Sequence, residues 1–239
     1  MPQYSDDLWL GAASGPQSQG WAGPGQVYEG VGPLGRVYIY DIVPATISAT
    51  AVCAAQAVAA AGNATINGGS ASGGVATFNC ARNVSIVSSS ASDTTQTVTV
   101  TGTDIWGQAQ TSLLTINGTT TVNGNKTFKT ITRVAVSGVF VGNLSVGMGD
   151  SFGLPYRVTD AGYLLRTGWA GAVADNAGTF TAADTTSPAT SSTGDVRGTF
   201  LPASTASNGT RRLVIAIGLT AIAAGPDATQ VGAIGVTPA

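Results

Sequence analysis

The chain has 239 residues, of which only 9% are charged, and its formal net charge at pH 7 is −2. It contains one glutamate, two lysines and no histidine, so it is poor in strong helix formers and lacks the usual base of a serine or cysteine hydrolase. Its arginines are scattered apart from Arg211-Arg212, so we expect no direct contact with nucleic acid. The N-terminus has no basic and apolar leader pattern, and no run of 18 apolar residues occurs. We therefore expect neither a signal peptide nor a membrane span.

Residues 1–43 predict an extended N-terminal arm that is rich in Gly, Pro and Gln. Aromatic side chains are spaced through it without a helical or strand period, and such side chains often anchor interfaces. The interface candidates in the arm are Tyr4, Trp9, Trp21 and Tyr28. The arm either lies on a neighbouring subunit or folds back on its own domain. Its last part, Arg36–Val43, alternates as a first strand that ends at Pro44.

Residues 44–239 predict one β domain with a C-terminal tail. Ala45–Ala61 is rich in alanine but has no clear helix cap and several β-branched residues, which favours strand or irregular chain. Short strands are expected at Asn63–Ile66 and Val75–Asn79, on either side of a Gly68–Gly74 loop.

The central segment, Arg82–Val136, holds four β-rich runs separated by turn residues. In the second run the alternation of apolar and hydroxyl residues places Val98 and Val100 on one face of a sheet. The turns between runs include Asn117-Gly118 and Asn123-Gly124. The segment predicts an antiparallel meander of Asn83–Ser88, Gln96–Thr103, Thr111–Ile116 and Lys126–Val136.

The last hundred residues continue the β pattern. A strand is expected after Ser137, and another near Tyr163–Arg166, followed by Trp169, an exposed residue and a further interface candidate. Further expectations are a turn-rich corner at Asp150–Tyr156, a loop or edge strand at Thr179–Thr193, a hairpin of Asp195–Leu201 with Arg211–Ile217, and a closing strand or second strap at Val231–Val236. Within the hairpin Leu213, Ile215 and Ile217 share one face. Many short strands with regular turn signals predict an all-β fold, an antiparallel β-sandwich or jelly roll.

Two motifs resemble catalytic signatures. Gly149–Gly153 fits G-x-S-x-G, the motif of a nucleophilic serine on a turn between a strand and a helix. That serine needs a histidine as its base, and the chain has none; Leu154-Pro155 also argues against a following helix. Gly30–Gly35 fits G-x-G-x-x-G but precedes a strand rather than opening a helix. We interpret the two motifs as a turn and a flexible arm, and we expect no catalytic residue, no cofactor and no enzyme activity.

The two cysteines, Cys53 and Cys80, are expected to be small buried free thiols. Two distant cysteines without a histidine do not make a zinc site, and the aspartates show no calcium-loop spacing. We therefore expect no metal site.

Several segments together resemble virion structural proteins of tailed bacteriophages. They are Ala81–Ile86, Thr97–Asp104, Gly107-Gln108, Lys126–Ile131, Gly194–Gly198 and Asn208–Leu213. The likeness runs over roughly residues 45–218 as a pattern of strands and turns. It implies a capsid decoration or cement protein on the virion surface, assembled in the host cytoplasm, with a β-sandwich or jelly-roll subunit. Its implied partners are the major capsid protein and, as a homotrimer, the chain itself.

Two alternatives stay open. The first is another virion part, such as a tail, collar or fibre component or the shell protein itself. The second is a carbohydrate-binding adhesion module with Trp106 and Trp169 as stacking platforms. The simpler interpretation of these two tryptophans is that they are core or interface residues.

Overall fold

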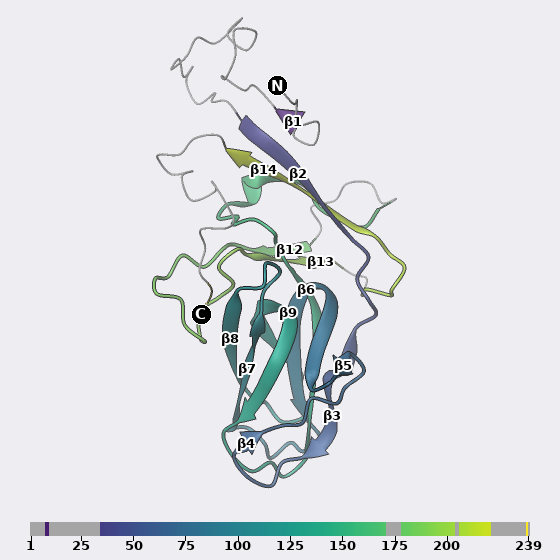
Figure 1. The fold of residues 1–239 in the computed structure, drawn as a ribbon, viewed down its shortest axis with the longest axis vertical. Helices are drawn as coiled ribbons and strands as arrows, with labels where there is room; N and C mark the ends of the chain where they lie inside the picture. The colour runs from purple at the N-terminus through teal and green to yellow at the C-terminus, as the bar shows by residue number, and fades with distance from the viewer. Residues whose placement is uncertain (1–7, 10–33, 171–177, 204–205, 221–237, 239) are drawn as a thin grey trace, which may run out of the picture.

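The computed structural model describes residues 8–9, 34–170, 178–203, 206–220 and 238. Its regular structure is nearly all β, arranged as a large curled antiparallel sheet and a smaller sheet, which confirms the predicted all-β sandwich or jelly-roll class (Figure 1). A short 3-10 turn spans Ala161–Tyr163. The strands are β1 (Leu8–Trp9), β2 (Leu34–Ile42), β3 (Ser48–Ala57), β4 (Gly62–Asn63), β5 (Ala71–Ser72), β6 (Val75–Ser88), β7 (Thr97–Thr103), β8 (Ala109–Thr115), β9 (Val122–Val136), β10 (Asn143–Gly153), β11 (Leu164–Arg166), β12 (Gly178–Thr181), β13 (Thr199–Pro202) and β14 (Leu213–Thr220).

The large sheet has the strand order β12-β13-β10-β6-β9-β7-β8, and β3 also pairs with β10. Along one edge β10 pairs with β6, and along the other it pairs first with β3 and then with β13. Because the sheet curls, alternate side chains of β3, β6, β7, β9 and β10 meet in one apolar core. Fully buried members include Val52, Val84, Val98, Val134 and Val146.

The small sheet has the order β1-β2-β14-β11 and packs over the β10–β13 end of the large sheet (Figure 1). The expected common face of Leu213, Ile215 and Ile217 is confirmed, since all three are fully buried. They pack with Phe152 and Phe200 of the large sheet in a second core. The strand β10 therefore contributes to both cores and ties the two sheets together.

The central strands are confirmed, but the predicted meander is wrong. Strands β7 and β8 form a hairpin whose turn is closed by Asp104, which accepts hydrogen bonds from the backbone N–H groups of Trp106 and Gln108. Instead of joining β8, strand β9 passes to the other edge of β7 and pairs with β7 and β6. This placement puts Phe128 and Ile131 of β9 in the middle of the curled sheet, where both are fully buried.

Two further expectations after residue 140 are wrong. Segments 195–201 and 211–217 do not form a hairpin, because β13 pairs with β12 and β10 while β14 pairs with β2 and β11. The apolar face of β14 is buried only in this way, against the tyrosines of β2 and the second core. The segment 150–153, expected to lie in a turn-rich corner, belongs to β10.

Other expectations hold wholly or in part. Segment 45–61 contains strand β3, and Thr179–Thr181 lies in β12 at the edge of the large sheet. Of the expected Asn63–Ile66 strand only Asn63 lies in β4, whereas the Gly68–Gly74 loop contains β5, which turns into β6 through Gly73 and Gly74 at positive φ. Cys53 and Cys80 are buried free thiols. Residues 34–42 of the predicted arm form β2, while the strand expected at Val231–Val236 lies outside the described residues.

Candidate functional site

The fully buried Arg82 connects the two sheets. Its guanidinium donates to the carbonyl oxygens of Gly149 (2.7 Å) and Ala45 (2.7 Å), to the Asp150 carboxylate (2.5 Å) and to Ser207 Oγ (3.0 Å). These groups belong to β10, the β2–β3 linker and the loop between β13 and β14. Burial lowers the pKa of Arg82, and the neighbouring Asp150 opposes that shift. One buried cation thus fixes three segments that join the small sheet to the large one.

The outer face of the small sheet carries two exposed apolar side chains, Ile39 of β2 and Leu165 of β11, which together are called the upper apolar surface. Ile39 is 62% exposed and pairs with Ala216 of β14, and Leu165 of β11 is 50% exposed. Tyr38 and Tyr40 pack toward the second core, so strand alternation turns Ile39 outward. At the margin of this surface the Arg212 guanidinium pairs with Asp41, and this hydrogen bond holds the pKa of Asp41 below its usual range.

A second exposed apolar patch, the lower tip, lies at the opposite end of the large sheet, on the loop between β9 and β10. Val139 is 57% and Val141 is 75% exposed, whereas Phe140 between them is buried. The loop is held by Asp93, whose carboxylate accepts hydrogen bonds from the backbone N–H groups of Val141 (2.8 Å) and Gly142 (3.0 Å) and from Ser88 Oγ (2.5 Å). The two valines are therefore presented on a loop of defined conformation.

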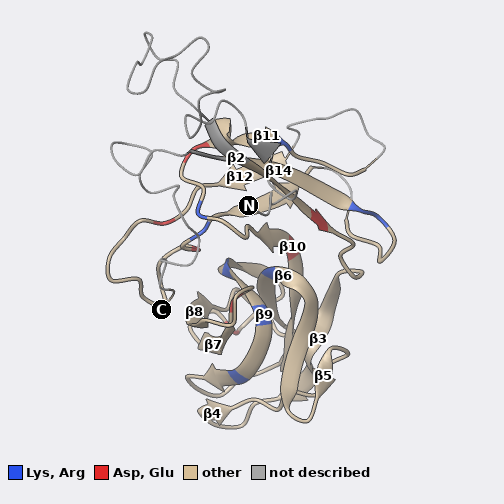
Figure 2. Ribbon diagram, turned by 45° about the horizontal axis from the view of Figure 1, so that its top comes forward, with Lys and Arg blue, Asp and Glu red and all other residues tan. Residues whose placement is uncertain are grey.

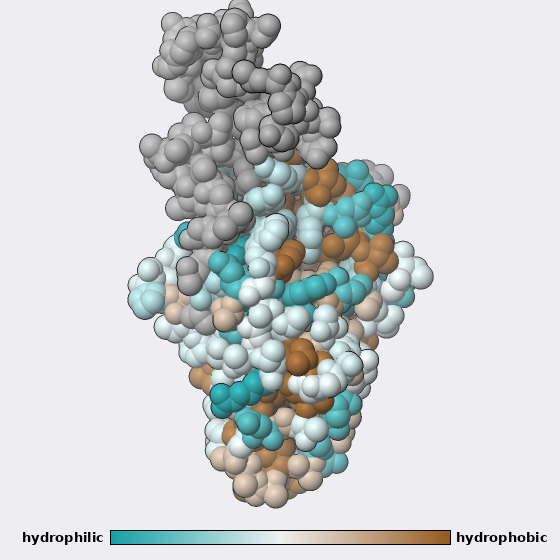
Figure 3. Space-filling model, in the orientation of Figure 1, coloured by the Kyte–Doolittle hydropathy of each residue, from teal (hydrophilic) through white to brown (hydrophobic). Residues whose placement is uncertain are grey.

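The two apolar surfaces lie at opposite ends of the described body (Figure 1). Figure 2 shows that charged residues are sparse over the strands between them, and Figure 3 shows hydrophobic residues at the surface near the small sheet and again in the lower half. Exposed clusters of large apolar side chains mark sites of contact with other macromolecules. The arrangement suits a molecule that holds two neighbours at once.

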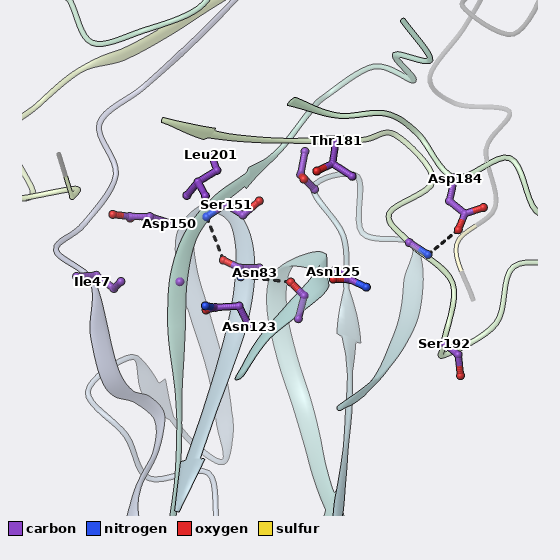
Figure 4. A pocket seen from close by; sticks show the side chains of 14 residues that line it. Ile47, Asn83, Asn123, Asn125, Asp150, Ser151, Thr181, Asp184, Ser192 and Leu201 are labelled. Carbon is purple, nitrogen blue, oxygen red and sulfur yellow. Dashed lines mark hydrogen bonds between the residues drawn. The ribbon is translucent and has the colours of Figure 1, made fainter. Parts of the chain in front are cut away.

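A polar groove of ≈ 670 Å³ opens on the side of the large sheet (Figure 4). Its floor is formed where β6 meets two bulged strands. Residues 149–151 of β10 lie opposite one residue of β6, Asn83, because the register passes from Met148↔Val84 to Phe152↔Arg82. A similar bulge in β9 spans residues 124–126. A β-bulge bends its strand and changes the direction of the side chains there. Here the two bulges form the floor of the groove.

The side chain of Asn83 joins the two bulges. Its Oδ1 accepts from the Ser151 N–H (3.1 Å) and its Nδ2 donates to the Gly124 carbonyl oxygen (3.2 Å) (Figure 4). Across the groove the Asp184 carboxylate accepts from the backbone N–H groups of Thr186 and Gly194 at 2.8 and 2.7 Å. Hydrogen bonds from Thr186 and Gly194 hold the pKa of Asp184 below its usual range, so it stays ionised.

The structure places the predicted interface residues as follows. Tyr4, Trp21 and Tyr28 lie outside the described residues, and Trp9 lies in β1, whose backbone pairs with β2. The expectation that Trp169 is exposed is wrong, because it packs against the second core and its backbone bridges to β14.

Trp106 is 49% exposed at the β7–β8 turn, with its Nε1 donating to the Pro155 carbonyl oxygen (2.9 Å). Trp106 and Trp169 thus sit on different elements, and neither lines the groove. The sequence did not single out Ile39, Val141 or the groove asparagines. Two of the latter, Asn123 and Asn125, lie in a stretch whose Asn123-Gly124 pair predicted a turn, although it forms a bulged strand.

Among the described residues no cluster of three or more His, Cys, Asp or Glu side chains could hold a metal ion. The same part of the chain contains no helix long and apolar enough to cross a membrane.

Comparison with known proteins returns no match: no family model, no curated protein and no solved structure resembles this chain significantly.

Proposed function

We propose that this chain is a non-enzymatic structural protein of a tailed-bacteriophage virion, acting as a capsid cement or decoration protein that bridges major capsid protein subunits. The observation that carries the proposal is the pair of exposed apolar surfaces at opposite ends of one β body. The pattern of strands and turns over residues 45–218, interpreted in the sequence analysis as similar to virion structural proteins, agrees with this proposal.

The proposal depends on a rigid connection between the two ends. Strand β10 runs from the lower tip to the second core, and its Asp150 is paired with the buried Arg82. Each apolar surface is small, so each contact alone is weak. Two weak contacts on a rigid body reinforce each other, because the second forms at a high effective concentration once the first is made. A homotrimer, which the resemblance implies, would multiply these contacts.

The proposal assigns different roles to the two ends. The lower tip has two exposed valines on a fixed loop and suits insertion between shell subunits, whereas the upper apolar surface is a sheet face and suits contact with a flatter neighbour. Aromatic residues of the arm, including Tyr4 and Trp21, are proposed to add further contacts to the capsid.

The test is to strip this protein from purified capsids and then add it back. Stripped capsids should lose integrity at lower temperature and at low salt, and added protein should restore it. Stripped particles that withstand heat and low salt as well as intact particles would refute the cement function.

A further inference from the structure

We propose that the polar groove is a binding site for a neutral oligosaccharide, a role independent of capsid bridging. The ≈ 670 Å³ cavity falls in the size range of ligand pockets. It continues into a second hollow of ≈ 290 Å³ that shares Asn123, Gly124, Asn125 and Ser192 with it. The groove is therefore elongated, which suits a chain of sugar units better than a compact ligand.

The groove wall carries hydrogen-bonding groups that are free to engage a ligand. Asn123 and Asn125 project from the start of β9 (Figure 4), and within the described residues their side-chain amides make no hydrogen bond. Each amide offers two donors and one acceptor carbonyl, which together match the donor and acceptor hydroxyls of a sugar. Ser192 adds an exposed hydroxyl on the facing loop.

The floor beneath these groups is already fixed. Asn83 is 3% exposed and uses its amide to join the bulges of β9 and β10. A carbon atom added at Gly149 would lie 2.4 Å from Asn83 Oδ1, so the close approach of the two strands requires glycine at this position. A pre-formed floor lowers the ordering cost of binding.

The charges of the groove select against acidic ligands. Its lining includes the carboxylates Asp150 and Asp184, and no lysine or arginine lines it within the described residues. Both carboxylates are held by protein hydrogen bonds, Asp150 by Arg82 and Ser207, and Asp184 by backbone N–H groups. Phosphate, sulfate and sialic acid would find no lysine or arginine to pair with in the described lining of the groove. The favoured ligand is therefore uncharged.

One end of the groove is apolar. Ile47 and Leu201 are 44% and 42% exposed there and lie near Asp150 (Figure 4). Sugar rings present patches of C–H groups between their hydroxyls, and burial of such patches against aliphatic side chains is favourable. An extended peptide would instead be recognised chiefly through an unpaired strand edge, whereas the floor strands β6 and β10 are paired with each other.

The test uses a printed array of neutral, sialylated and sulfated oligosaccharides together with extended peptides, followed by calorimetry with the strongest neutral binder. Neutral oligosaccharides should bind, and the double variant Asn123→Ala/Asn125→Ala should weaken binding by roughly tenfold or more through lost hydrogen bonds. The matched control is Asn143→Ala, an exposed asparagine at the far end of β10, which should bind as the unmodified protein does.

A readout without variants is the movement of the Asn123 and Asn125 side-chain amide signals in NMR spectra when the oligosaccharide is added. The proposal is overturned if no neutral oligosaccharide binds, if acidic ones or peptides bind in preference, or if the double variant and these amide signals are unaffected. Capsid binding by the double variant should be unchanged, so failure here is distinguishable from failure of the cement function.

Discussion

The guanidinium of Arg82 and the carboxylate of Asp150 form a buried ion pair, with 2.5 Å between Nη2 and Oδ1. Arg82 is fully buried and the Asp150 side chain is 13% exposed. Removal of one partner of such a pair leaves an uncompensated charge in a low-dielectric interior. This pair joins β6 to β10 beside the second core, so its loss affects both sheets.

We predict that Arg82→Ala lowers the free energy of unfolding by about 3–5 kcal/mol, because Asp150 and two carbonyl oxygens lose their buried donor. The measurement is urea unfolding followed by circular dichroism. Arg133→Ala is the matched control, because Arg133 is exposed and makes one side-chain hydrogen bond to Asn63. The control should change stability by less than about 0.5 kcal/mol. Equal losses of unfolding free energy in the two variants would contradict the role of Arg82 in connecting the two sheets.

The substitution Gly149→Ala should destabilise the groove floor. The new methyl group would lie 2.4 Å from Asn83 Oδ1 and 2.8 Å from Nδ2, so the amide must move and release Ser151 and Gly124. Overpacking of this kind costs about 1–3 kcal/mol. Gly69→Ala serves as control, because a carbon atom there meets nothing within 4 Å. Thermal unfolding of the two variants checks the prediction, and a melting temperature for Gly149→Ala no lower than that of the control would refute it.

We predict that the folded protein loses stability at acidic pH in part because Asp93 becomes protonated. Burial works against ionisation of this carboxylate, but hydrogen bonds from Ser88 and from the backbone of Val141 and Gly142 outweigh it and hold the pKa of Asp93 below its usual value. The stabilisation of the folded protein by ionised Asp93 is fully present above the unfolded-state pKa of about 3.9. It is lost as the pH falls through the lower pKa that Asp93 has in the folded protein.

Asp93→Asn should therefore be less stable than the unmodified protein at neutral pH, and its melting temperature should fall less between pH 5 and pH 2. Melting curves at a series of pH values measure both. Parallel pH profiles for the two proteins would show that Asp93 does not contribute.

The cysteine thiols should be unreactive in the folded protein. Burial raises the pKa of Cys53 to about 12 and that of Cys80 to about 11, so both are protonated near neutral pH, and the thiolate is the reactive form. We expect almost no reaction with a disulfide reagent at pH 8 in the native state and full reaction of both thiols in urea. Rapid labelling of either cysteine without denaturant would contradict their placement in the core.

The sequence predicts the local features of this fold better than it predicts which strands pair with each other. Two predicted faces are confirmed, that of Val98 and Val100 and that of Leu213, Ile215 and Ile217. They could be predicted because the alternation of buried and exposed side chains along a strand follows from the residues next to each other in the sequence. The partner of each strand depends on residues far away. The partner of β14 is β2, more than 170 residues earlier, and no local pattern near Leu213 identifies it.

The candidate sites were harder still to predict. Gly149–Ser151 and Asn123-Gly124 carry residues typical of turns, yet each is a bulge whose shape depends on the Asn83 side chain from another strand. The sequence predicts an exposed Trp169, but in the structure this side chain packs against the second core. Exposure of Ile39 follows from the orientation of β2, which only the paired sheet defines.

The apolar surfaces provide the mutational test of the proposed function. Ile39→Asp and Val141→Asp should each weaken binding to stripped capsids by roughly thirtyfold, because a charge placed in an apolar contact removes about 2 kcal/mol or more. Leu113→Asp is the control, since Leu113 is 41% exposed on β8, away from both surfaces. Sedimentation of capsids with added protein measures the binding. Equal binding by all three variants would exclude the two surfaces as capsid contacts.

The most direct test of the central claim is quantitative mass spectrometry of the source particle, which counts this chain against the major capsid protein. A cement protein follows the symmetry of the shell, so we predict about one copy per capsid subunit, or one trimer at each threefold position. A ratio of a few copies per hundred subunits would instead place the chain in the tail, collar or fibres. Its absence from the particle would contradict a virion function altogether.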